Sequence, residues 1–196
     1  MANKDAAFGF RPIGKVGQNA DNQGLSEYNI AASSDAIYQN DPVQFAATGY
    51  IAVAATTSAV LLGSLNGVQY TDATNQKPRW ANHLAAGNTA TDIVGFVSDD
   101  PYERFEVQAD GTLAIADIGR NTDIVYAAGT SPNFVSKVEI DSNTSNVTTV
   151  SKQFRILGVA KDIENSELSN VTTYAANVNV VGIINEHFLK STTGIL

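Results

Sequence analysis

Residues 105–116 read Phe-Glu-Val-Gln-Ala-Asp-Gly-Thr-Leu-Ala-Ile-Ala, and this stretch gives the clearest indication of the fold. Two runs that favour β-structure flank Asp110-Gly111, a dipeptide that suits a tight hairpin turn because both residues tolerate positive φ. We therefore predict a β-hairpin with strands at 105–109 and 112–116.

The same pattern of short runs rich in Val, Ile, Thr, Tyr and Phe continues on both sides of this stretch, separated by Asn, Asp, Gly and Pro clusters such as Asn66-Gly67. No long window keeps the 3.6-residue period of a helix, so at most a helical turn is expected near 82–86 or 164–168. The fold class predicted is all-β, a barrel or sandwich of about ten strands. The other expected strands are 27–31, 37–38, 42–45, 51–54, 59–64, 68–71, 93–97, 124–127, 135–140, 147–150, 153–159 and 176–184.

Three of these runs share an aliphatic pair followed by glycine, at Gly63, Gly95 and Gly158. A glycine inside a strand indicates a bulge or a close approach of another backbone. The similarity favours related hairpins and two β-subdomains at 28–118 and 119–196, although chance repetition of a common tripeptide is an open alternative.

Residues 1–27 are rich in Gly, Asn and Gln and show no sustained period, which indicates an extended N-terminal arm before a single β-rich domain at 28–196. The arm is more apolar and more basic than a solvated tail requires. Two interpretations are open: it packs on its own domain, or it reaches a neighbouring subunit. The residues that suggest contacts are Phe8, Phe10, Arg11 and Pro12.

Composition excludes several classes of function. The 196 residues carry a formal charge of -8 and no cysteine, so a disulfide framework, a thiolate zinc site and a cysteine nucleophile are ruled out. An acidic chain of this kind is a poor partner for nucleic acid. The longest apolar stretch, 50–62, is too short to span a membrane, and the first residues lack the pattern of a secretory signal.

Motifs for catalysis are weak. His83 and His187 stand far apart in the sequence and neither has a recognisable nucleophile beside it. No phosphate-binding glycine loop is present, so no cofactor is expected. One acidic cluster suits a calcium site or a pair of catalytic carboxylates, but ordinary loop and strand chemistry explains it better. Its members are Asp99, Asp100, Glu103 and Glu106. We predict neither an enzyme nor a metal site.

A second candidate contact region combines aromatic and basic residues, namely Tyr70, Arg79 and Trp80. Such a composition suits a protein interface or a platform for a sugar ring, and it also suits a core strand next to a loop. Interface and core are the two main alternatives.

The order of several strings resembles that of decoration (cement) proteins of tailed bacteriophages, notably marine phages. The strings are the Asn- and Gly-rich start, Leu62-Gly-Ser-Leu-Asn-Gly-Val-Gln-Tyr-Thr-Asp, Val97-Ser-Asp-Asp-Pro-Tyr-Glu-Arg-Phe-Glu-Val-Gln-Ala-Asp, Phe154-Arg-Ile-Leu-Gly-Val-Ala and Val181-Gly-Ile-Ile-Asn-Glu-His-Phe. The resemblance implies a virion protein that stabilises the outer capsid surface by bridging major capsid protein subunits, as a homodimer or homotrimer. The arm and the aromatic region are then the expected contacts.

Two other classes of protein fit the same sequence. One is a β-sandwich carbohydrate-binding or host-attachment module that uses Trp80. The other is a tail or neck component of a virus particle.

Overall fold

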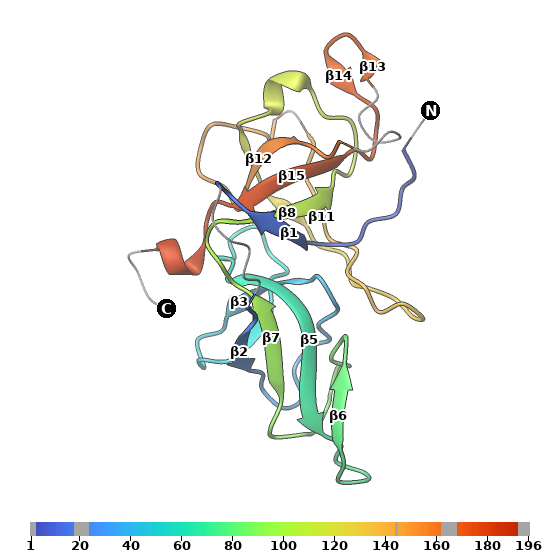
Figure 1. Ribbon diagram of the computed structural model, residues 1–196, viewed down its shortest axis with the longest axis vertical. Helices are drawn as coiled ribbons and strands as arrows, with labels where there is room; N and C mark the ends of the chain where they lie inside the picture. Colours follow the sequence, from blue (N-terminus) through green and yellow to red (C-terminus); the bar gives the residue numbers. More distant parts are fainter. Residues whose placement is uncertain (1–2, 18–23, 144, 162–167, 192–196) are drawn as a thin grey trace.

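The computed structural model describes residues 3–17, 24–143, 145–161 and 168–191, and it is built almost wholly from antiparallel strands (Figure 1). A five-stranded sheet has the order β1 (Arg11–Lys15), β8 (Glu103–Gln108), β15 (Asn179–Ile184), β12 (Phe154–Val159), β9 (Asn121–Thr122). A six-stranded sheet has the order β2 (Ser26–Asn29), β7 (Val94–Ser98), β5 (Gly63–Thr71), β3 (Pro42–Phe45), β4 (Ile51–Val53), and β6 (Pro78–Ala81) pairs with β5.

The remaining elements are small. Two-stranded ladders join β10 (Ile124–Val125) to β11 (Glu139–Ile140) and β13 (Leu168–Asn170) to β14 (Thr173–Tyr174), and the two short 3-10 helices are η1 (Ile115–Asp117) and η2 (Phe188–Lys190). The all-β prediction is confirmed, and the architecture is sandwich-like. The barrel alternative is wrong, because β1 and β9 end the five-stranded sheet without pairing with each other.

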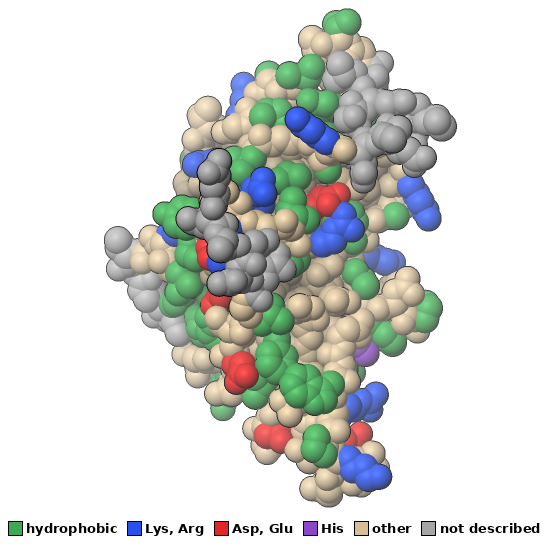
Figure 2. All heavy atoms as spheres, in the orientation of Figure 1, with side chains coloured by type: hydrophobic (Ala, Val, Ile, Leu, Met, Phe, Trp, Pro, Cys, Tyr) green, Lys and Arg blue, Asp and Glu red, His purple; other side chains and the backbone are tan. Residues whose placement is uncertain are grey.

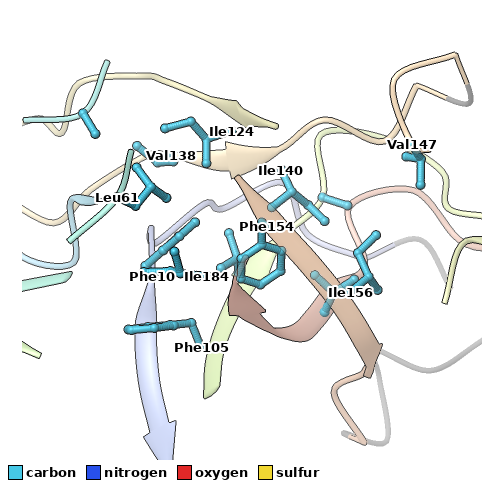
Figure 3. Packing of buried hydrophobic residues seen from close by; sticks show 14 of the residues in the cluster. Phe10, Leu61, Phe105, Ile124, Val138, Ile140, Val147, Phe154, Ile156 and Ile184 are labelled. Carbon is cyan, nitrogen blue, oxygen red and sulfur yellow. The ribbon is translucent and has the colours of Figure 1, made fainter. Parts of the chain in front are cut away.

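Each main sheet has its own hydrophobic core. In β12, buried Phe154 and Ile156 alternate with exposed Arg155 and Leu157, which is the two-residue period of a sheet with one covered face. The core of the five-stranded sheet centres on Phe10, Phe105 and Phe154 (Figure 3). The six-stranded sheet buries a separate aliphatic cluster, made of Ile30, Ile37, Val43, Ile51, Leu62, Leu65, Val68, Leu84, Ala90, Ile93 and Val97.

The described part of the N-terminal arm packs on its own domain. Residues 11–15 form β1, an edge strand antiparallel to β8 with Arg11 opposite Glu106. Pro12 is compatible with this position because an edge strand tolerates the missing N–H. Further out, the side chain of Gln108 donates to the carbonyl of Lys4 at 3.0 Å and accepts from the N–H of Ala6 at 2.9 Å.

The hairpin predicted at Asp110-Gly111 is wrong. Residues 112–116 do not form a strand, and η1 begins at Ile115. The carboxylate of Asp110 accepts hydrogen bonds from the N–H and the hydroxyl of Ser142, at 2.8 and 2.6 Å, and Ala109 bridges to Ile140. Contacts with a distant segment therefore replace the local turn, and they provide hydrogen-bond partners for the polar groups of Asp110 and Ser142.

Asn66-Gly67 is a second local prediction that the structure corrects. Instead of a turn between two strands, it is a bulge inside the single long strand β5. The predicted strands 37–38 and 147–150 are reduced to isolated bridges, and 82–86 forms turns and a bridge in place of a helical turn. Most of 164–168 lies outside the described residues.

Candidate interaction surfaces

The first predicted contact region, at the arm, divides into a buried part and an exposed part. Phe10 is fully buried, with its ring centroid 5.7 Å from that of Phe105 and 5.2 Å from that of Phe154. This corrects the expectation that Phe10 contacts a partner: its ring completes the protein's own core. Phe8 is only half-buried and Arg11 is exposed, so these two residues lie closer to solvent.

Arg11 is held on the outside of the five-stranded sheet. Its guanidinium forms an ion pair with Glu106 and lies over the ring of Phe8, 4.8 Å from the ring centroid. The side chain remains 52% exposed, so this ion pair is accessible to a partner. Pro12 is half-buried beside it.

The second predicted region is divided by strand alternation. Arg79 and Trp80 are successive residues of β6 and so point to opposite faces of the sheet. Arg79 lies opposite Tyr70, which packs against the core of the six-stranded sheet, and it forms an ion pair with Asp72 at 3.5 Å. Trp80 is on the outer face with 66% of its surface exposed.

Trp80 stacks on a neighbour that sequence reasoning missed. Its ring lies 5.2 Å from that of Phe96, with an angle of 15° between the planes. The rings come from β6 and β7, on opposite sides of β5, and they meet because the β5 residue opposite Phe96 is Gly67, which has no side chain. We call this outer surface of β5, β6 and β7, with Trp80 and Phe96 at its centre, the aromatic face. Figure 2 shows hydrophobic side chains gathered over these strands.

The two predicted regions are not brought together. β1 belongs to the five-stranded sheet and β6 lies at the far end of the six-stranded sheet (Figure 1). The chain therefore presents two separate exposed regions, one on each sheet.

The acidic cluster Asp99, Asp100, Glu103 and Glu106 forms hydrogen bonds and ion pairs with the two N-terminal strands. Asp99 accepts from the hydroxyls of Ser26 and Tyr28, and burial together with this carboxylate raises the pKa of Tyr28 to about 12. Asp100 pairs with Lys15 at 2.8 Å. The other two members, Glu103 and Glu106, accept from the N–H of Gly14 and from Arg11. These carboxylates thus have β1 and β2 as partners, and in the described residues no group of three potential ligands is arranged to hold a metal ion.

The two histidines occupy different environments. His83 stacks between Tyr38 and Phe134, at 6.2 and 3.9 Å between ring centroids. His187 is buried, and its Nδ1 accepts from the N–H of Leu189. Burial, and next the charge of Lys190, lowers the pKa of His187 to about 4, so its ring is neutral near pH 7.

An open hollow lies beside His187, with a volume of about 230 Å³, and residues 60, 185–187, 190 and 191 line it. Among the described helices, none has the length and apolar character needed to cross a bilayer.

Comparison with known proteins gives no identity for the chain: no family model, no curated protein and no solved structure matches it.

Proposed function

We propose that the protein is a structural component of a virus particle, which binds the outer surface of an icosahedral phage head and stabilises it by bridging major capsid protein subunits. The proposal starts from the resemblance of the sequence to decoration proteins. The structural observation that supports it is the pair of separate exposed regions on two sheets, each sheet with its own core.

A molecule with two such regions is suited to contact two neighbouring subunits at once. Bridging raises the effective concentration of the second contact, so two modest contacts hold the molecule firmly on a lattice. A homodimer or homotrimer would multiply the number of contacts again. The exposed residues of the predicted regions, Arg11 and Trp80, are the side chains proposed to reach a partner.

The test is a binding experiment with purified, undecorated phage heads. The protein is mixed with heads, the particles are pelleted, and bound copies per head are counted by gel densitometry. Saturation at a number tied to the capsid lattice is the expected result. Failure to bind the head surface at any protein concentration would refute the proposal, and binding to tails alone would assign the protein to the tail or neck.

A second candidate function is carbohydrate binding in host attachment, which the exposure of Trp80 favours. An exposed indole ring offers an apolar face on which a sugar ring can stack. Binding on a glycan array that Trp80→Ala abolishes, with head binding unchanged, would favour this function over the first.

A further inference from the structure

A row of basic and aliphatic side chains crosses the outer face of the five-stranded sheet. Arg104 on β8 lies opposite Ile183 on β15, and Ile183 lies opposite Arg155 on β12. Since adjacent strands are about 4.8 Å apart, the two arginine backbones stand about 10 Å apart with Ile183 between them. Both arginines extend from the side of the sheet opposite to the core, because their neighbours Phe105 and Phe154 are buried.

Lys190 adds a third positive charge at the same end of the sheet. Its ammonium donates to the carbonyl of Ile184 at 3.2 Å and lies 5.0 Å from the centroid of the Tyr102 ring. Tyr102 precedes Arg104 by two residues, which is the spacing of side chains on one face. Burial, and next the charge of Arg155, lowers the pKa of Lys190, as a close positive neighbour does.

Among the described residues these three cations form no ion pair, although the chain has 20 acidic residues and a charge of -8, and the charge of Asp100 acts on Lys190 only as a weaker opposing influence on its pKa. Arg11, Lys15, Arg79, Arg120 and Lys152 each form an ion pair. In contrast, the Nε of Arg104 is buried without any hydrogen-bond acceptor, and that of Arg155 donates only to the amide oxygen of Asn121, at 2.9 Å. Neither guanidinium is paired with a carboxylate of its own sheet, and an acidic side chain of a partner can form charge-assisted hydrogen bonds with such groups.

Aliphatic side chains lie next to the cations. Leu157 is 42% exposed on β12, and Val181 and Ile183 are half-buried on β15. We call this surface, formed by Arg104, Leu157, Arg155, Val181, Ile183 and Lys190, the basic face. Figure 2 shows blue and green side chains together over the upper sheet.

We infer that the basic face docks a carboxylate-rich area on the outer surface of the shell protein, with Arg104, Arg155 and Lys190 pairing with its acidic side chains. The inference deepens the proposed function, on which it rests. Arginine beside aliphatic side chains on an open surface is typical of protein interfaces. A nucleic acid fits less well, since the face offers only three cations outside ion pairs on a strongly acidic chain.

The test compares three proteins in the head-pelleting experiment at low and high salt. The double variant Arg104→Gln/Arg155→Gln removes two charges from the basic face, and the matched control Lys77→Gln/Lys137→Gln removes two charges at exposed positions outside it. We expect the double variant to bind about tenfold more weakly or worse, the control to bind like the wild type, and wild-type binding to weaken with salt. Thermal melting checks the fold, and Arg155→Glu alone, at an exposed position, is the second variant.

The outcomes separate the two claims. Wild-type protein that does not bind heads overturns both the proposed function and the inference. If the wild type binds heads and both the double variant and Arg155→Glu bind equally well, only the inference is overturned. An equal loss in the Lys77→Gln/Lys137→Gln control also overturns it, because the effect then follows net charge and not this face. Binding to duplex DNA that the double variant loses, with head binding intact, would assign the face to nucleic acid.

Discussion

Replacement of Phe10 by alanine tests whether the N-terminal arm is part of the folded domain. The ring is fully buried and contacts the rings of Phe105 and Phe154 within 6 Å between centroids. Truncating a buried phenylalanine removes its transfer free energy and leaves a cavity, at a cost of about 3–5 kcal/mol. For a chain of this size, each kcal/mol lowers the melting temperature by roughly 2–4 °C. Phe10→Ala is therefore expected to lower it by roughly 6–20 °C.

Two matched variants separate the core role from other effects. Phe10→Leu keeps most of the volume and should cost less than half as much, whereas Phe8→Ala removes only a half-exposed ring under Arg11 and should cost about 1 kcal/mol or less. Urea denaturation followed by tyrosine and tryptophan fluorescence gives the free energies of unfolding. A loss below about 1 kcal/mol for Phe10→Ala would refute the reasoning, since the arm would then contribute little to the core.

Three further predictions concern single positions. Gly63→Ala should destabilise by at least about 1–3 kcal/mol because the new Cβ would collide with the carbonyl of Ser98, whereas Gly158→Ala, whose Cβ would meet open space, should change stability by under about 1 kcal/mol; thermal melting compares the two. Burial raises the pKa of Asp41 to about 6, which means that the folded state favours the protonated carboxyl group. The resulting stabilisation is complete below pH 4 and is lost as the pH rises through 6. The free energy of unfolding of Asp41→Asn minus that of the wild type should therefore be higher at pH 8 than at pH 4, by up to about 3 kcal/mol. Urea denaturation at both pH values measures this difference. Trp80→Ala should cost about 1 kcal/mol or less in stability, because the ring is exposed, while weakening binding to heads in the pelleting experiment.

Local sequence patterns predict the all-β class and several of the strands, but they miss β1 and β6 and predict the connections poorly. The predicted strand 42–45 matches β3, and the glycine argument is confirmed at two positions: the backbone of Ser98 closely approaches Gly63, and a register shift occurs at Gly158, whereas the atoms close to Gly95 belong to core side chains. Asp110-Gly111 predicts a hairpin turn just as strongly, yet no hairpin forms. The Asp110 side chain is instead hydrogen-bonded to Ser142, 32 residues away. The β-propensity of a segment indicates only which conformations it can adopt. Long-range contacts determine which of these conformations forms.

Within the candidate surfaces, the sequence predicts residue types better than partners. The exposure of Trp80 follows from its place on a short strand pairing with β5, but Phe96 comes from a different strand, and only the sheet order brings the two rings together. Arg104 and Arg155 are 51 residues apart, and β15 places them in one row. No periodicity within either segment could reveal that row.

The short connection between the two sheets bears directly on the proposed function. β7 ends at Ser98 in one sheet and β8 begins at Glu103 in the other, so only 99–102 separates them. Asp99 in this connection binds β2, and Asp100 binds Lys15 at the end of β1, so both N-terminal strands are fixed to the same point. A bridge between subunits gains from effective concentration only if its two contact regions keep a defined geometry. The carboxylates that resembled a catalytic or calcium cluster are therefore better explained as the groups that hold the basic face and the aromatic face in a fixed relation.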